Sequence, residues 1–220
     1  MSIATLILGN PGTGKTTSLR NMPVSETLLM QVVKKPLPFR ANAWSYMDKE
    51  KNPKGNIFVT DSAEQIIHVM RKTSRKIIVV DDCNYVMSNS FMRRATEKGY
   101  DKFTEMAQQT FSIFDAASNL ADDVRVYLFA HTQVTEDGVT RFRTVGKLLD
   151  EKVSLDGLVT ICLRTCVVDG QYLFSTRNNG SDTVKTPIGM FDQTFIENDL
   201  LKIDEAVRNY YGIGEKREAA

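Results

Sequence analysis

Residues 9–16 read Gly9-Asn10-Pro11-Gly12-Thr13-Gly14-Lys15-Thr16, and they directly follow the apolar run from Ile3 to Leu8. This spacing is typical of a phosphate-binding loop, whose glycines let backbone N–H groups turn towards phosphate oxygens. A helix after the loop would direct its positive end to the same group. The Lys15 ammonium is expected to reach the β- and γ-phosphates, and the Thr16 hydroxyl to bind Mg²⁺. The sequence therefore predicts that residues Gly9 to Thr17 bind a nucleoside triphosphate, with Lys15 also acting in catalysis.

The length and charge of the chain limit the classes of protein to consider. The chain has 220 residues, of which 42% are hydrophobic, and this is enough to bury one sizeable core. We therefore expect residues 1–212 to form a single domain and residues 213–220 to form a disordered tail. The formal net charge of +1 excludes a strongly basic protein, so any binding of nucleic acid has to use a local patch.

The cysteines and the apolar segments indicate a cytoplasmic location. Cys83, Cys162 and Cys166 are an odd number with one close pair, which predicts neither a disulfide framework nor a zinc site. No segment approaches ~18 consecutive apolar residues, and no charged region with a cleavage site precedes the first strand. We expect a soluble protein that does not contact a membrane.

Strand-like apolar runs alternate with helical or irregular stretches over the first 130 residues. Such alternation predicts parallel strands joined by crossovers. Asp61 is expected to cap one helix, and a longer helix with 3.6-residue periodicity is expected after Asp101. The five expected strands are Ile3 to Leu8, Thr27 to Val33, Ile57 to Thr60, Ile77 to Val80 and Val124 to Ala130.

After Ala130, the alternation of strand-like and helical stretches gives way to hairpin patterns. Asp137-Gly138 and Asp169-Gly170 are turn signals, and they predict antiparallel hairpin strands that join the sheet. A last short helix is expected from Asp204 to Tyr211, ending near Gly212. The predicted fold class is therefore α/β: a mainly parallel central sheet flanked by helices, with antiparallel hairpin strands in the C-terminal third.

Two acidic residues follow the apolar strand Ile77 to Val80. In an open parallel sheet, ligands bind at the carboxyl ends of the strands, so Asp81 is expected to hold Mg²⁺ at this edge. Asp82 has two interpretations: it orients or deprotonates an attacking water as a catalytic residue, or it caps the following helix.

His131 follows the strand Val124 to Ala130 and is expected at the same edge of the sheet. A polar group there can sense the γ-phosphate and pass its presence to the following loop. The alternative interpretation is a structural hydrogen-bond donor. We therefore treat His131 as a candidate catalytic residue.

Several basic residues are candidate contacts for single-stranded DNA or for a neighbouring subunit. Basic side chains interleaved with aromatics, such as Trp44 and Tyr46, suit single-stranded nucleic acid, although such aromatics can also pack on the core. Cations supplied across a subunit interface can stabilise a transferred phosphoryl group. The candidate DNA contacts are Lys34, Lys35, Arg40, Arg141, Arg143 and Lys147, and the candidate cations for a neighbouring subunit are Arg177 and Lys185.

Taken together, these residues resemble the RecA-like recombinase core within the P-loop NTPase superfamily. The resemblance is closer to the phage-encoded, minimal RecA-like single-strand annealing proteins, and it spans Gly9 to about Phe191. The pieces that carry it are the phosphate-binding loop, Val79 to Asp82, Lys34 to Phe39, Ala130-His131, Thr144 to Asp150, and Arg177 with Lys185.

The resemblance implies ATP and Mg²⁺ as ligands, a γ-phosphate sensor at His131, and a homo-oligomer, ring or filament, acting on single-stranded DNA. In that family a catalytic glutamate ends the strand after the first helix, whereas this strand contains Leu29-Met30-Gln31 followed by Val32, Val33 and two lysines. Hydrolysis is therefore expected to be slow, or Asp82 substitutes for the glutamate.

The function expected from the sequence is an ATP-binding and ATP-hydrolysing protein that anneals or recombines single-stranded DNA for a phage in a bacterial host. Three alternatives stay open. They are a helicase-loader or packaging-type ATPase, a small-molecule kinase, and a nucleotide-binding regulatory module with negligible turnover.

Overall fold

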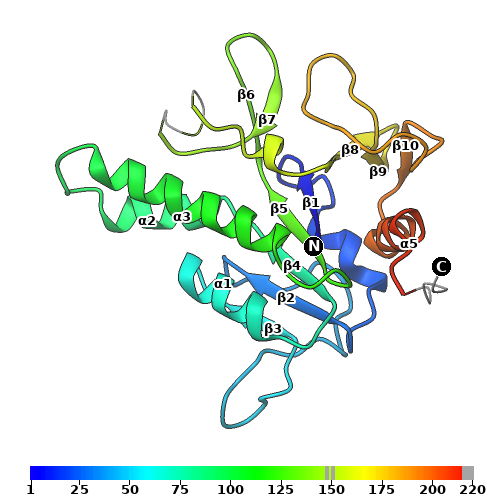
Figure 1. Cartoon of the computed structure of the whole chain (residues 1–220), viewed down its shortest axis with the longest axis horizontal. Helices are drawn as coiled ribbons and strands as arrows, with labels where there is room; N and C mark the ends of the chain where they lie inside the picture. Colours follow the sequence, from blue (N-terminus) through cyan, green and yellow to red (C-terminus); the bar gives the residue numbers. More distant parts are fainter. Residues whose placement is uncertain (147–148, 150–151, 215–220) are drawn as a thin grey trace, which may run out of the picture.

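The fold was analysed in a computed structural model that describes residues 1–146, 149 and 152–214. Its centre is an eight-stranded sheet with the order β10-β9-β8-β1-β5-β4-β2-β3 (Figure 1). The elements are β1 (Ile3–Leu8), η1 (Thr16–Asn21), β2 (Thr27–Gln31), β3 (Ile57–Val59), α1 (Ala63–Lys72), β4 (Ile77–Asp81), α2 (Tyr85–Arg93), α3 (Asp101–Ser118), β5 (Arg125–Ala130), β6 (Thr132–Val134), β7 (Thr140–Phe142), η2 (Asp156–Leu158), β8 (Ile161–Val168), β9 (Gln171–Ser175), β10 (Phe195–Glu197) and α5 (Leu200–Tyr211).

The strands from β8 to β3 in this order are parallel, and β9 and β10 extend the sheet in antiparallel fashion. This confirms the predicted α/β class with antiparallel strands in the C-terminal third. At the turn between β8 and β9, Asp169 and Gly170 both adopt positive φ angles, of 51° and 78°, as a two-residue hairpin with a matching twist requires.

The hydrophobic core has one cluster on each face of the sheet, because successive strand residues point to opposite faces. Leu6, Met30 and Leu128 face a cluster that includes residues of α1, α2 and α3. Ile7 and Phe129 face a second cluster that includes residues of η1 and α5. The sheet is therefore covered on both sides, which explains why its central strands are almost entirely apolar.

Three expectations about the elements are wrong. The helix after the phosphate-binding loop is only a six-residue 3-10 helix, η1, and it ends just before Pro23, where the residue preceding a proline favours an extended backbone. Ser62 caps α1 by accepting from the Gln65 N–H, whereas Asp61 binds Asn89 and Arg93 of α2. The hairpin around Asp137-Gly138 forms a separate sheet, β6-β7.

The last helix agrees with the prediction at its C-terminal end. α5 ends at Gly212, which adopts the left-handed conformation with a φ of 62°, as expected for a glycine that terminates a helix. Residues 215–220 of the predicted tail lie outside the described residues. The assignment of residues 1–212 to one domain stays a prediction.

Candidate phosphate-binding site

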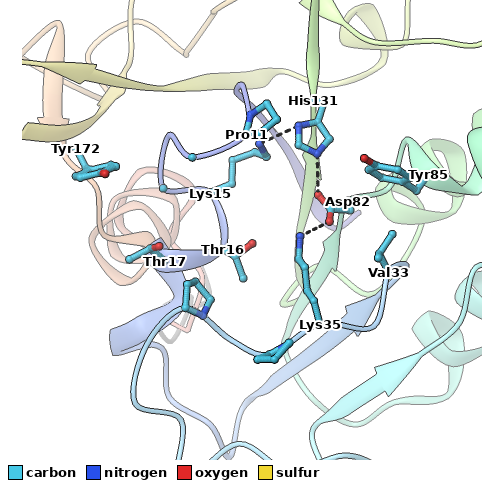
Figure 2. Close-up of a pocket in the computed structure, with 14 residues that line it drawn as sticks. Pro11, Lys15, Thr16, Thr17, Val33, Lys35, Asp82, Tyr85, His131 and Tyr172 are labelled. Carbon is cyan, nitrogen blue, oxygen red and sulfur yellow. Dashed lines mark hydrogen bonds and ion pairs between the residues drawn. The ribbon is translucent and has the colours of Figure 1, made fainter.

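The carboxyl ends of three neighbouring parallel strands bring the predicted site together. β5 lies between β1 and β4, so the residues that follow these three strands meet at one edge of the sheet (Figure 2). These are the loop after Leu8, the pair Asp81-Asp82, and His131. The strand order therefore places His131 between the loop and the two carboxylates, as the general rule for ligand sites in such sheets predicts.

Threonine side chains hold the first residues of the loop in place, and two of these threonines, Thr132 and Thr165, lie outside the loop. The Thr132 hydroxyl donates to the Asn10 side-chain oxygen at 2.6 Å, and the Thr13 hydroxyl donates to the Asn10 carbonyl at 2.7 Å. The hydroxyl oxygens of Thr13 and Thr165 are 2.6 Å apart. A Cβ at Gly9 would lie 1.9 Å from the Thr165 hydroxyl, so only glycine fits where the loop passes β8.

Some backbone donors of the loop are left without a partner among the described residues, although the Gly9 N–H donates to the Ala130 carbonyl and the Thr13 N–H to the Asn10 carbonyl. In the part of the chain that the structure describes, the N–H groups of Gly12, Gly14 and Lys15 donate no hydrogen bond to another residue. Gly12 and Gly14 have φ angles of 80° and 95°, which glycine adopts without strain. Successive unpaired N–H groups in such a turn form an anion-binding concavity.

Lys15 is buried within the loop that carries it. Its ammonium donates to the Gly9 carbonyl at 2.6 Å and to the Asn10 carbonyl at 3.2 Å. Burial lowers the pKa of Lys15 to about 8, against the opposing effect of the Asp82 and Asp81 charges. A buried ammonium with a lowered pKa is stabilised by an added anion, so this lysine is suited to bind phosphate.

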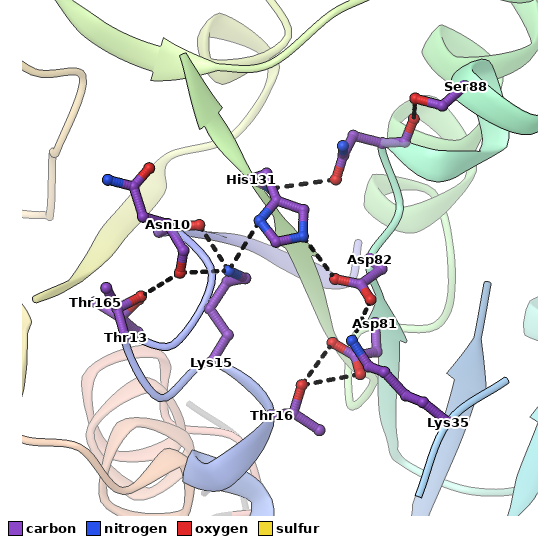
Figure 3. Close-up of polar contacts among 12 residues, drawn as sticks. Asn10, Thr13, Lys15, Thr16, Lys35, Asp81, Asp82, Ser88, His131 and Thr165 are labelled. Carbon is purple, nitrogen blue, oxygen red and sulfur yellow. Dashed lines mark hydrogen bonds and ion pairs between the residues drawn. The ribbon is translucent and has the colours of Figure 1, made fainter. Parts of the chain in front are cut away.

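Thr16 and Asp81, the two predicted Mg²⁺ ligands, lie in direct contact. The Thr16 hydroxyl lies 3.1 and 3.0 Å from the two carboxylate oxygens of Asp81 (Figure 3). Burial, and then the neighbouring Asp82 charge, raise the pKa of Asp81 to about 6, so a cation would stabilise its ionised form. Mg²⁺ commonly takes one carboxylate together with waters and substrate phosphates. The residues present therefore fit Mg²⁺, with Thr16 and Asp81 as its protein ligands.

No group of three or more His, Cys, Asp and Glu side chains that could hold a metal ion occurs among the described residues. A metal in this cleft would therefore depend on the bound phosphate for further ligands.

Asp82 points into the site and does not cap α2. Its backbone is left-handed, with a φ of 62°, which aspartate tolerates better than most residues. The carboxylate forms an ion pair with Lys35 and lies 3.2 Å from His131 Nε2. Burial opposes its ionisation, but the hydrogen bonds from His131 and Lys35 outweigh burial and lower the pKa of Asp82 below its usual value.

His131 connects Asp82 to Lys15. Its Nδ1 lies 3.4 Å from the Lys15 ammonium, which can only donate, so Nδ1 is the acceptor. The proton of the neutral ring is then on Nε2, which faces Asp82. The Asn84 side chain accepts from the His131 backbone N–H at 3.1 Å, and the Tyr85 ring packs edge-on against the imidazole. His131 is thus held in a defined orientation by the segment between β4 and α2 and by the first residue of α2.

Lys15, Thr16, Asp82 and His131 are among the residues that line a cleft of about 720 Å³. This volume is within the usual range for small-molecule sites. Several lining residues have no role predicted from the sequence, and they come from three further segments of the chain. Tyr85 and Tyr172 could have been noted only as single aromatics near strand or hairpin ends. The lining residues without an expected role are Val33, Pro36, Pro38, Tyr85 and Tyr172.

The candidate DNA contacts lie in different surroundings. Lys35 lines the cleft, whereas Lys34 is exposed, with its ammonium 5.2 Å from the centre of the Tyr46 ring. Arg40 is exposed. Trp44 packs partly buried against the core, edge-on to Phe39, so of the two aromatics only Tyr46 is exposed for stacking.

The other basic candidates that the structure describes do not line this cleft, although the Arg143 N–H donates to the carbonyl of the lining residue His131 at 2.9 Å. Arg141 belongs to β7 and Arg143 follows it as an exposed residue. In Figure 1 the β6-β7 hairpin and the loop that precedes β3 lie at opposite ends of the view. Arg177 is exposed and donates to the Asp192 carbonyl at 2.7 Å. Lys185 is exposed and pairs through its backbone with Cys162.

Lys147, the remaining candidate DNA contact, lies outside the described residues. The Thr144 to Asp150 stretch of the resemblance is likewise described only in part, at residues 144–146 and 149.

Comparisons with known proteins do not show a family for this chain. No protein-family model matches the sequence, and no curated protein matches it. Among solved structures, the chain is similar to the genome packaging NTPase B204 from Sulfolobus turreted icosahedral virus 2, in complex with ATP-gammaS. The identity is 7%, the match covers 82% of this chain and 78% of that chain, and the TM-score is 0.37. The mainly parallel sheet with its loop after β1 is consistent with a P-loop NTPase-like fold.

Among the described residues, no helix is both long enough and apolar enough to span a membrane.

Proposed function

We propose that the protein binds ATP together with Mg²⁺ in this cleft and hydrolyses the bond between the β- and γ-phosphates. The observation that carries the proposal is the convergence of a phosphate-binding loop with unpaired N–H groups, the Thr16–Asp81 pair, and the Asp82–His131 pair at one edge of the sheet. These groups provide anion binding, metal ligands and a polar pair for water.

In this proposal, Asp82 acts on the attacking water. Because its pKa is lowered, the carboxylate stays ionised and accepts hydrogen bonds, but it is a weak base. Orientation of the water is therefore its main contribution, as in other NTPases where chemistry depends chiefly on positioning. His131 would sense whether the γ-phosphate is present, because it contacts Lys15 on one side and Asp82 on the other.

We further propose that the nucleotide controls assembly of the protein, as a homo-oligomer, on single-stranded DNA during phage recombination or replication in the host cytoplasm. Support comes from the RecA-like resemblance of the sequence and from the exposed basic residues Lys34, Arg40 and Arg143. Tyr46 is 41% exposed beside Lys34, and such a pair can stack a base next to a phosphate. Arg177 and Lys185 would reach the nucleotide of a neighbouring subunit.

One observation favours a second candidate function, a nucleotide-binding regulatory module with negligible turnover. The end of β2 carries Gln31, which is fully buried and donates to the Lys35 carbonyl at 3.0 Å. This amide supports the backbone and cannot act as a base. Without a glutamate at this position, tight binding with little hydrolysis is chemically reasonable.

A turnover assay separates these functions. ATP hydrolysis is measured with and without single-stranded DNA, alongside annealing of complementary strands, and Lys15→Ala serves as the inactive control. Hydrolysis that rises with DNA and is lost in Lys15→Ala supports the proposal. Stimulated hydrolysis without annealing favours a helicase-loader or packaging-type ATPase, and binding without turnover favours the regulatory module. Absence of ATP binding by the wild-type protein contradicts all three.

A further inference from the structure

Lys35 lies inside the nucleotide cleft, although it belongs to the basic segment that the sequence assigned to DNA. It lines the same cleft as Lys15, Thr16 and Asp82. Its side chain is 39% exposed, in contrast to the 5% of the Asp82 side chain with which it pairs. The ammonium is therefore accessible from the cleft while its partner is buried (Figure 2).

The backbone around Lys35 is held in place by two side chains. The Gln31 amide donates to the Lys35 carbonyl at 3.0 Å, and the Tyr46 hydroxyl lies 3.4 Å from the same oxygen. Pro36 follows directly and fixes its own φ angle. A lysine whose main chain is anchored in this way presents its ammonium to one region of the cleft, at a reduced cost in conformational entropy.

Lys35 ends a chain of polar contacts that starts at the phosphate-binding loop. Lys15 contacts His131, His131 contacts Asp82, and Asp82 contacts Lys35 (Figure 3). The two lysines thus lie at opposite ends of one connected network. An anion that enters between the loop and this network meets Lys15 from one side and Lys35 from the other.

A simpler interpretation is that Lys35 only neutralises Asp82. The structure favours a further role, because Asp82 already has His131 as a second hydrogen-bond partner. A lysine ammonium has three donors on a flexible stem and can exchange partners. In addition, a terminal phosphate in the cleft would offer Lys35 an ionised acceptor of its own, of the kind that forms strong charge-assisted hydrogen bonds.

We propose that Lys35 is a phosphate-binding residue that moves from Asp82 to the terminal phosphate of the bound nucleoside triphosphate. The inference rests on the proposed function and deepens it. The cation that stabilises the terminal phosphate then comes from the same chain, before any residue of a neighbouring subunit contributes. Release of Lys35 leaves the Asp82 carboxylate with a free acceptor for water, so occupancy of the terminal phosphate site also prepares Asp82.

The experiment compares the affinities of the full chain for ATPγS and ADP in the presence of Mg²⁺, by calorimetry. Lys35→Ala is expected to weaken ATPγS binding about tenfold or more, with ADP binding changed by no more than about threefold. Lys35→Arg keeps the charge and should restore most of the ATPγS affinity. Lys72→Ala is the matched control, since Lys72 is exposed at the end of α1 and does not line the cleft, and it should bind both nucleotides as the wild-type protein does.

Two outcomes would overturn the inference. They are an equal loss of ADP and ATPγS affinity in Lys35→Ala, and unchanged ATPγS affinity. If the ATPγS affinity is unchanged and single-stranded DNA binding is lost, Lys35 belongs to the DNA surface instead. A thermal melt of each variant verifies folding, and the Lys35→Met variant, which keeps the aliphatic stem, replaces Lys35→Ala if that variant unfolds. Failure of the wild-type protein to bind either nucleotide would instead reject the proposed function itself.

Discussion

The Thr16 hydroxyl lies within hydrogen-bond distance of both carboxylate oxygens of Asp81, at 3.1 and 3.0 Å. Sixty-five positions separate the two residues in the chain, and they meet because β1 and β4 end at the same edge of the sheet. A hydroxyl and a carboxylate that lie this close together are suited to be the protein ligands of the Mg²⁺ that we propose.

Loss of the Thr16 hydroxyl should therefore weaken binding of the Mg²⁺–nucleotide complex. Thr16→Ala is expected to lower ATP affinity in Mg²⁺ by about tenfold, or ~1.4 kcal/mol, with little effect when Mg²⁺ is chelated. Thr16→Ser keeps the hydroxyl and should bind as the wild-type protein does. Equal losses with and without Mg²⁺ would show that Thr16 has no role at the metal.

Asp81→Asn should raise the free energy of unfolding and abolish Mg²⁺-dependent hydrolysis. Because burial and Asp82 raise the pKa of Asp81 from 3.8 to about 6, its ionised form opposes folding. At pH 7 the asparagine variant is expected to be more stable by about 1 kcal/mol, or about 2–4 °C in melting temperature, while Mg²⁺-dependent hydrolysis is lost.

The gain in stability of Asp81→Asn over the wild-type protein should increase with pH. The folded protein binds a proton more tightly than the unfolded chain, so the advantage is absent below the unfolded pKa and grows as the pH rises from about 4 to 6. Melting curves across this range measure it. A difference in melting temperature that does not change with pH would contradict the assignment of the raised pKa to Asp81.

Gly9→Ala tests the close passage of the loop against β8. The new Cβ would lie 1.9 Å from the Thr165 hydroxyl and 2.7 Å from that of Thr13, so we expect a loss of roughly 1–3 kcal/mol in the free energy of unfolding. Adding Thr165→Ala removes the nearest atom and should recover part of this loss. Denaturant titrations of the single and double variants measure the coupling, and strict additivity would argue against the contact.

Tyr172 lies on the other side of the loop from Asp82 and Tyr85 (Figure 2), and it is 53% exposed. At this end of the cleft its ring is available to stack on the nucleoside. Tyr172→Ala is expected to weaken ATP binding by about tenfold, given that stacking on an aromatic ring contributes ~1–3 kcal/mol per base. Affinity for inorganic tripolyphosphate should not change. Tyr100→Ala, at an exposed position outside the cleft, is the control, and equal losses for both ligands would contradict stacking.

A buried ion pair attaches α5 to the sheet. Arg125 donates twice to Asp204 at 2.9 Å, and the Tyr127 hydroxyl donates to the same carboxylate at 2.7 Å. Asp204→Ala leaves the arginine buried without a partner and should destabilise the protein by about 3–5 kcal/mol. Chemical denaturation measures this, with the exposed neighbour Glu205→Ala as control. An exposed ion pair contributes at most about 1 kcal/mol to stability. If Asp204→Ala lowers the free energy of unfolding by less than this, the Arg125–Asp204 pair is dispensable.

Much of the fold could be predicted because it depends on local patterns. The apolar runs that became β1, β2, β4 and β5 are short and bounded by polar residues, and their alternation with helical stretches required parallel crossovers. Boundaries were less accurate. The capping role of Asp61 was wrong because Asn89 and Arg93 of α2 bind its carboxylate, and no pattern near residue 61 contains that information.

By itself, the sequence determined which residues could hold a polyphosphate, because the loop from Gly9 to Thr16 is continuous and its function depends on local spacing. It also placed Asp81, Asp82 and His131 after strands. Only the tertiary structure decided that β5 lies between β1 and β4, so that His131 joins Lys15 to Asp82, and that Lys35 points into the cleft. Strand order and side-chain direction depend on which apolar faces bury one another across the whole chain, and contacts between distant residues leave no mark in the local sequence.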